Sequence, residues 1–170
     1  MRRKSTARGS AENVRTLLAQ LGCTLGERDV HINFPGGAPV DGPSAGAAMA
    51  VVAISALTGR RIDGRSAVTG EITIHGAVKA VGGVPAKVEA ARQAGISRVF
   101  IPKENDTEMI HAADIEVVGV SSLAEVLRAM LLPPGVEADE PAPAALAENL
   151  PLAAQGEQGV PAVGAGANVT

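Results

Sequence analysis

Aromatic residues are almost absent from this chain of 170 residues. Phe34 and Phe100 are the only two, and the sequence contains neither tryptophan nor tyrosine. Binding of single-stranded nucleic acid relies on base stacking against aromatic faces, so the composition argues against that class of partner. Because 46% of the residues are hydrophobic, the chain can still bury one core, built from alanine, valine, isoleucine and leucine.

Cysteine and long apolar runs are scarce as well. Cys23 stands alone, which excludes a disulfide framework or a cysteine-based zinc site within one chain. A single thiol fits a reducing cytoplasm, where we expect the protein to act. No stretch approaches the ~18 consecutive apolar residues that a membrane-spanning helix needs. The basic start of the chain is followed by no apolar segment, so we expect neither a secretory signal nor a membrane partner.

An excess of basic charge is also missing. Residues 1–132 carry 15 basic and 13 acidic residues, whereas 133–170 carry five carboxylates and no lysine or arginine. The balanced body gives no electrostatic reason to expect a nucleic acid as partner. Six of the eleven prolines lie in 133–170, and this composition predicts disorder. We therefore expect a basic segment 1–9, a folded domain 10–132 and a disordered tail 133–170.

Apolar periodicity and glycine positions predict alternating helices and strands. Helices are expected over 10–21, 44–58, 85–94, 105–113 and 122–132. Strands are expected over 29–34, 66–69, 72–81 and 98–101, and over 115–120, with a turn or bulge at Gly76. The segment 44–58 is apolar on nearly every face, which predicts a buried central helix. The alternation predicts an α/β or α+β fold.

The sharpest feature is the run Asp41-Gly42-Pro43-Ser44-Ala45-Gly46 at the start of the central helix. Proline suits the first helical position and places Ser44 in the first turn, where backbone N–H groups have no helical partner. Those donors and the helix dipole can stabilise an oxyanion beside the serine hydroxyl. Taken alone, a simple helix cap at Asp41 or Ser44 is the more common alternative.

Two other motifs fit the same segment poorly. The glycines and serine of 42–46 match the Gly-x-Ser-x-Gly nucleophile elbow, but prolines and glycines stand where a strand must lead into it. Gly37 and Gly42 have the spacing of a P-loop, yet Pro43-Ser44 stands where a lysine is required. We therefore expect no ATP site of that kind.

A serine hydroxyl needs a base to become a nucleophile. His31, His75 and His111 are the only histidines, and none lies in a pattern that marks a triad member. Lysine can serve instead where burial lowers its pKa, and Lys87 has mainly small and apolar neighbours. Serine–lysine pairs are an established variant of the triad, although spacing alone favours an exposed Lys87.

Three blocks of this sequence resemble the signature blocks of Lon protease proteolytic domains, in the family's order and at about its spacing. They are Asp-Gly-Pro-Ser-Ala-Gly at 41–46, Thr-Gly-Glu-Ile at 69–72 and Gly-Gly-Val-Pro-Ala-Lys at 82–87. Pro102-Lys103-Glu104-Asn105 also resembles the family's Ile-Pro-x-x-Asn segment. The flanking segments 9–15 and 32–37 are most similar to B-type Lon proteins of spore-forming bacteria.

The resemblance implies an α+β fold and a serine endopeptidase that hydrolyses unfolded or damaged proteins through an acyl-enzyme. It implies that Ser44 is the nucleophile, Lys87 the general base and Thr69 a threonine that hydrogen-bonds near the lysine. The residues expected to support the active site are Asp41, Gly42, Pro43 and Ala45.

Members of this family form hexameric rings and unfold substrates with an AAA+ ATPase that precedes the proteolytic domain. This sequence contains no AAA+ module, so we expect no cofactor or metal in the chain itself. ATP and magnesium would act only through that module, which a separate chain could supply. The family's first strands, upstream of about residue 10, are expected to be missing, and Asn33 replaces a histidine of many members. A catalytically silent scaffold, as in RadA-like recombination proteins, or an inactive fragment is the alternative.

Overall fold

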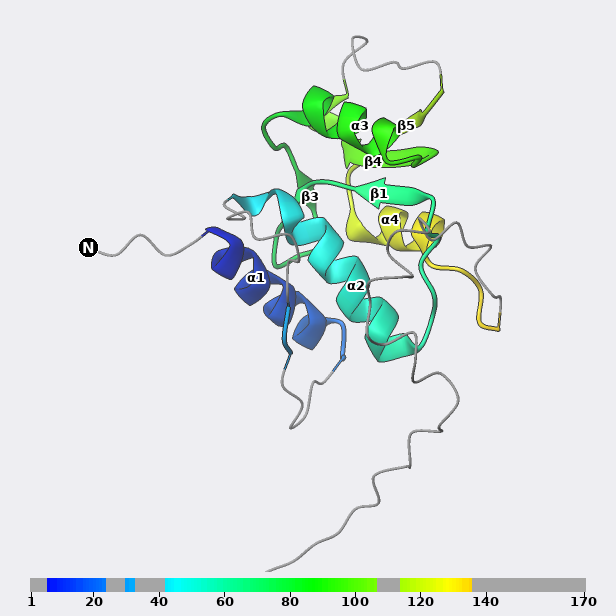
Figure 1. Ribbon diagram of the computed structural model, residues 1–170. Helices are drawn as coiled ribbons and strands as arrows, with labels where there is room; N and C mark the ends of the chain where they lie inside the picture. Colours follow the sequence, from blue (N-terminus) through cyan, green and yellow to red (C-terminus); the bar gives the residue numbers. More distant parts are fainter. Residues whose placement is uncertain (1–5, 24–29, 33–41, 107–113, 136–170) are drawn as a thin grey trace, which may run out of the picture. The chain divides into compact units, whose positions relative to one another are not determined.

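The computed structural model describes residues 6–23, 30–32, 42–106 and 114–135, all within one compact unit, Met1–Asp139. The helical elements are α1 (Thr6–Gln20), η1 (Pro43–Ala45), α2 (Gly46–Thr58), α3 (Val84–Gln93), η2 (Lys103–Asn105) and α4 (Leu123–Met130), η marking a 3-10 turn. The strands are β1 (Ser66–Val68), β2 (Glu71–Ile72), β3 (Val78–Lys79), β4 (Arg98–Pro102) and β5 (Glu116–Val120). This mixture of helices and strands (Figure 1) confirms the α+β class.

A three-stranded parallel sheet, in the order β1-β4-β5, organises the described residues. Val68 pairs with Phe100 of the central strand, and Phe100 pairs with Val118. A separate antiparallel hairpin joins β2 to β3, with Glu71 opposite Lys79. The hairpin and α3 together form the connection from β1 to β4, which are parallel and therefore need a crossover.

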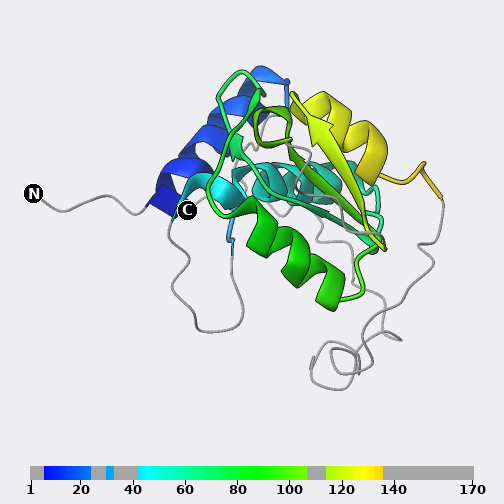
Figure 2. The same ribbon diagram turned by 90° about the horizontal axis from the view of Figure 1, so that it is seen from above.

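Alternate side chains of β4 pack into two different hydrophobic clusters. Phe100 belongs to the larger cluster, with residues of α1, α2 and α4. Val99 and Ile101 belong to a smaller cluster with Val84 and Val88 of α3. Because successive strand residues point to opposite faces, α3 covers one face of the sheet, and the other helices cover the opposite face (Figure 2).

Local signals explain where the helices begin and end. After α1, the N–H of Cys23 donates to the Leu18 carbonyl and the N–H of Gly22 to the Ala19 carbonyl, the two bonds of a Schellman motif. At the start of α4, the Ser122 hydroxyl accepts from the N–H of Glu125, whose carboxylate accepts from the N–H of Ser121. These caps satisfy backbone groups that a helix end leaves without a helical partner.

The central helix is correctly predicted, but it is not buried on every side. Met49, Ala50, Val51 and Ile54 of α2 lie in the larger cluster, whereas the Val52 side chain is 58% exposed. One face of α2 is therefore open in the described structure.

Several predicted boundaries are wrong. Of the predicted strand 29–34, only 30–32 are described, and these residues form no strand. The predicted strand 72–81 is divided into β2 and β3 of a hairpin, whereas the turn predicted at Gly76 is confirmed by its φ of 79°. The predicted helix 105–113 fails at its start, since Asn105 ends η2 and Asp106 is not helical. The rest of that helix, and the tail from 136 onward, lie outside the described residues.

The N-terminal helix also begins earlier than predicted. The first helix begins at Thr6, inside the segment 1–9 that was assigned to a basic N-terminal extension. In the described part of the chain, no helix has the length and apolar character that crossing a membrane requires.

Candidate active site

Ser44 lies in η1, one turn ahead of α2. Pro43 occupies the first position of this 3-10 turn, Gly42 is its N-cap, and the N–H of Gly46 donates to the Pro43 carbonyl. The prediction placed Ser44 in the first α-helical turn, whereas α2 begins only at Gly46. The 3-10 turn leaves Ser44 half-buried at the mouth of the helix.

Hydrogen bonds hold the backbone of Ser44 against the turn that follows β1. The Ser44 carbonyl accepts the N–H of Gly70 at 2.9 Å and the Thr69 hydroxyl at 3.3 Å. In return, the Gly70 carbonyl accepts the N–H of Ala47 at 3.0 Å. Thr69 is only 8% exposed, and its own N–H donates to the Phe100 carbonyl of β4. The position of the serine is therefore set by the end of the parallel sheet.

The hydrogen bonds of position 70 to Ser44 and Ala47 need a residue without a side chain there. A Cβ atom on Gly70 would lie 2.6 Å from Cγ1 of Val78 and 3.7 Å from Cβ of Ala47. Val78 is buried in the larger cluster, so it has little room to move. Gly70 thus permits the close approach of the β1–β2 turn to the start of α2.

Lys87 is the fourth residue of α3 and lies next to the glycines that precede the helix. Its N–H donates to the Gly83 carbonyl at 3.2 Å, and its ammonium Nζ donates to the Gly82 carbonyl at 2.8 Å. Gly83 adopts a left-handed conformation with a φ of 70° at the N-cap of α3, which glycine adopts without steric cost. The side chain is half-buried, and this burial lowers the pKa of Lys87 below its ordinary value.

The topology brings the turn that holds Ser44 and the start of α3, which carries Lys87, to one edge of the sheet. Thr69 directly follows β1, and η2 directly follows β4, so both lie where parallel strands end. Helix α3 returns the chain to the start of β4, and therefore begins near that same edge. In Figures 1 and 2, α2 and α3 both begin on the left side of the molecule. The carboxyl edge of parallel strands is the usual ligand site of open α/β sheets.

The described bonds join Thr69 to Ser44 and not to the lysine. The Thr69 hydroxyl donates to the Ser44 carbonyl, whereas the Lys87 ammonium donates to Gly82. Among the described residues, no hydrogen bond joins Lys87 to Ser44 or to Thr69. The roles assigned to these three residues remain predictions, with Thr69 placed on the serine side.

The 3-10 turn also limits which N–H groups can face an oxyanion. The N–H of Gly46 is bonded to Pro43, and that of Ala47 to Gly70. A 3-10 turn over Pro43–Ala45 also uses the N–H of Ala45, which donates to the Gly42 carbonyl, so the N–H of Ser44 is the donor of this turn that faces no helical acceptor. Asp41, also predicted for the site, lies outside the described residues.

The histidines offer no alternative base in the described part. His31 and His75 are exposed, and His111 lies outside the described residues. Within the described ranges, no group of three or more histidine, cysteine, aspartate or glutamate residues could hold a metal ion.

The sequence did not predict a role for η2, whose side chains hold the loop before α3. Asn105 binds both backbone groups of Val81, and Glu104 binds the N–H of Ala80 and the Lys79 ammonium. The resemblance of 102–105 to the family's Ile-Pro-x-x-Asn segment was the only signal of this role.

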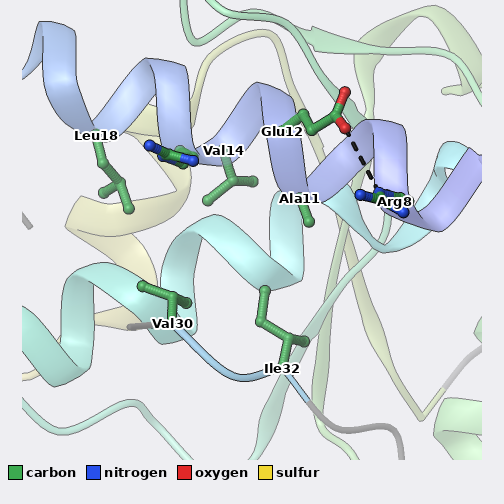
Figure 3. A pocket seen from close by; sticks show the side chains of 8 residues that line it. Arg8, Ala11, Glu12, Val14, Leu18, Val30 and Ile32 are labelled. Carbon is green, nitrogen blue, oxygen red and sulfur yellow. Dashed lines mark ion pairs between the residues drawn. The ribbon is translucent and has the colours of Figure 1, made fainter. Parts of the chain in front are cut away.

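An apolar pocket of about 280 Å³ lies elsewhere, between α1 and the extended segment 30–32 (Figure 3). Leu18 and Val14 of α1 and Ile32 of the extended segment point into it, and Arg8 pairs with Glu12 at 3.7 Å along α1. None of the predicted site residues lines this pocket, so it is not the place of the predicted peptidase chemistry.

Comparisons with known proteins agree with the motifs. The family model of the Lon protease (S16) C-terminal proteolytic domain matches residues 3–133. Lon protease 2 of Bacillus subtilis (strain 168) is 48% identical over 138 residues, which cover 81% of this chain and 25% of that protein. The Lon protease of Methanosarcina barkeri is 39% identical over 136 residues, covering 75% of this chain and 17% of that protein.

The relatives are much longer than this chain. The Lon protease of Clostridioides difficile (strain 630) is 49% identical over 113 residues, covering 63% of this chain and only 14% of that protein. The chain spans a quarter or less of the length of these relatives. The matched region is the one that the family model defines as proteolytic, and the chain therefore belongs to the Lon protease family, as a C-terminal proteolytic domain.

Proposed function

We propose that this chain is a serine endopeptidase that cleaves extended, unfolded polypeptide, with Ser44 as nucleophile and Lys87 as general base. The proposal rests on the observation that the elements holding Ser44 and Lys87 meet at one edge of the sheet. There, the β1–β2 turn holds Ser44, and α3 begins with a half-buried lysine of lowered pKa. A lysine of lowered pKa is more often neutral near pH 7 and can then accept a proton.

In the acylation step, the neutral amine of Lys87 takes the hydroxyl proton while Ser44 Oγ bonds to the substrate carbonyl carbon. The N–H of Ser44, at the start of the helix, stabilises the resulting oxyanion. Collapse of this intermediate breaks the peptide C–N bond, and the Lys87 ammonium returns its proton to the leaving amine. The lysine must turn from the Gly82 carbonyl, which it binds in this structure, towards Ser44.

In the deacylation step, water attacks the ester that joins the substrate to Ser44. Lys87 takes a proton from the water and delivers it to Ser44 Oγ as the ester bond breaks. The products are a shortened peptide with a new carboxyl end and the free enzyme. Each proton that the lysine takes is returned, so the cycle needs no cofactor in this chain.

An extended substrate also fits the sheet. Within the described residues, β1 pairs with β4 on one side only. A strand edge of this kind offers backbone N–H and C=O groups to an extended polypeptide. Selection of unfolded chains follows, because a folded substrate cannot present such a strand.

Unfolding of the substrate, in this proposal, is the work of a larger assembly. We place this domain in a hexameric ring in the cytoplasm, where an AAA+ ATPase with ATP and magnesium unfolds the substrate. Such an ATPase would lie outside the 170 residues, on the same or another chain. No observation favours the scaffold alternative, since Ser44, Thr69 and Lys87 are all present.

Cleavage of unfolded casein without ATP tests the proposal. The 170-residue chain is compared with Ser44→Ala and with Ser97→Ala, which removes an exposed hydroxyl that binds only the Arg65 carbonyl in the described structure. We expect cleavage by the parent and by Ser97→Ala, and none by Ser44→Ala. Equal cleavage by Ser44→Ala would exclude Ser44 as the nucleophile, and no cleavage by the parent would favour the scaffold or fragment.

A further inference from the structure

The loop between β3 and α3, residues 80–83, determines where the Lys87 side chain can lie. Both the N–H and the ammonium of Lys87 donate to carbonyls of this loop, those of Gly83 and Gly82. A displacement of the loop therefore displaces the ammonium. The contacts that hold the loop are accordingly part of the environment of the lysine.

One side-chain amide holds the loop at Val81. Asn105 Oδ1 accepts the N–H of Val81 at 2.9 Å, and Asn105 Nδ2 donates to the Val81 carbonyl at 3.1 Å. This pair of bonds satisfies both backbone groups of Val81, much as a neighbouring strand would. The Val81 carbonyl belongs to the peptide group that leads into Gly82, so the amide fixes the chain one peptide before the carbonyl that binds Lys87.

Neighbouring contacts keep Asn105 itself in place. It ends η2, directly after β4, and the adjacent Glu104 accepts the N–H of Ala80 at 3.2 Å. On the other side of the loop, Val81 packs against the smaller hydrophobic cluster that also contains Val84 and Val88 of α3. The loop is thus held between the sheet edge and the core beneath α3.

We infer that Asn105 is a positioning residue for Lys87, because its amide fixes the loop whose carbonyl binds the lysine ammonium. The inference rests on the proposed role of Lys87 as general base. An amide suits both backbone groups of Val81, since it supplies an acceptor and a donor from one planar group. Asn105→Asp has almost the same shape, but an ionised carboxylate only accepts and would repel the Val81 carbonyl.

The direct test measures Lys87 itself. Competitive acetylation with acetic anhydride across pH, followed by peptide mass spectrometry, gives the pH midpoint at which each lysine becomes reactive. In the parent 170-residue chain, the midpoint of Lys87 should lie below the ordinary lysine value, because burial lowers its pKa. In Asn105→Asp it should move up towards that ordinary value, because a released lysine becomes better solvated. An unmoved Lys87 midpoint in a folded variant overturns the inference.

A matched control separates the loss of the amide from the added charge. Gln93→Glu makes the same amide-to-acid change on an exposed position of α3, where the amide binds Glu89 and not the loop. We expect the Lys87 midpoint of this variant to equal that of the parent. If Asn105→Asp fails to fold, as judged by circular dichroism, the uncharged Asn105→Ser carries the same test.

The consequence for chemistry is measured at Ser44 with a fluorophosphonate probe, which forms an Oγ–P bond and releases fluoride. We expect Asn105→Asp to react between about tenfold and about a hundredfold more slowly, the usual effect of a misplaced catalytic group. In a Lys87→Met background the same change should have no further effect. Equal slowing in both backgrounds overturns the inference, whereas absence of labelling in the parent refutes the proposed function and leaves the midpoint measurement to decide the positioning.

Discussion

The backbone around Ser44 is held mainly by other backbone groups, with one side-chain hydroxyl beside them, whereas the loop before Lys87 is held by side chains. Gly70 binds both Ser44 and Ala47 through its N–H and carbonyl. On the lysine side, Asn105 and its neighbour Glu104 supply the corresponding bonds from the 3-10 turn η2.

This difference determines which substitutions each region tolerates. Backbone bonds survive most side-chain changes, but the close approach at Gly70 leaves no room for a Cβ atom. Side-chain bonds depend on the chemistry of one amide or carboxylate, while the surrounding loop remains exposed at Gly82 and Gly83. The serine region is therefore sensitive to volume, and the lysine region to hydrogen-bonding groups.

Replacement of the base should have the largest effect on activity. Lys87→Met is expected to slow casein cleavage by about 10²- to 10⁴-fold, the usual contribution of a general base. The unfolding temperature should not fall, because the change removes a partly desolvated charge. Lys103→Met, at an exposed position, is the matched control. Full cleavage by Lys87→Met would show that another group accepts the proton.

A methyl group at Gly70 should break the serine region through packing. Gly70→Ala places a Cβ atom 2.6 Å from the buried Val78 side chain, and overpacking of this kind costs about 1–3 kcal/mol. Urea unfolding gives the change in stability. Gly64→Ala is the control, since a Cβ atom there meets nothing within 4 Å. Equal stability of the two variants would mean that the turn moves freely, contrary to the account.

The elements that carry the site were largely predictable from the sequence, because local signals mark them. Pro43 and Gly59 bound the segment of η1 and α2, and Pro85 and Gly95 bound α3 closely. The short strand 98–101 was predicted to within one residue of β4. These boundaries depend on residues whose backbone preferences act locally.

The contacts that hold the site could not be predicted, because they join residues far apart in the sequence. The hydrogen bond from Gly70 to Ser44 joins the β1–β2 turn to η1, with α2 and β1 between them in the sequence. The amide of Asn105 binds Val81, which lies 24 residues away. No periodicity or spacing marks such contacts. The same reason explains the misplaced helix 105–113, since Asn105 serves the loop before α3 instead of a helix of its own.

A smaller effect is expected from the hydroxyl that supports the Ser44 carbonyl. Thr69→Val removes a bond of 3.3 Å and should cost about 0.5–1.5 kcal/mol of stability, the usual net value of one hydrogen bond. The carbonyl keeps the N–H of Gly70, so the serine region should weaken but not collapse. Thr58→Val, which removes a bond within α2 only, is the control. A loss no larger than that of Thr58→Val would deny Thr69 a supporting role.

The smallest effect is expected at the exposed ion pair of the lysine region. Lys79 Nζ and Glu104 Oε1 lie 2.8 Å apart, and the Lys79 ammonium is the main cause that lowers the pKa of Glu104. Glu104→Gln keeps an acceptor for the N–H of Ala80 but removes the charge. Its urea midpoint should fall slightly at low salt, and the difference should vanish at high salt because exposed pairs are screened. A difference that persists at high salt would show that more than the ion pair was lost.

The central claim is that Lys87 activates Ser44, and its most direct test is the pH dependence of fluorophosphonate labelling at Ser44. The neutral amine is the active form, so the labelling rate should rise with pH through the pKa of Lys87. Because burial lowers the pKa of Lys87 below its ordinary value, the midpoint in the parent should lie below that of an unperturbed lysine, and Lys87→Met should lose this rise. Labelling of Ser44 with the same pH profile in both proteins would contradict the account.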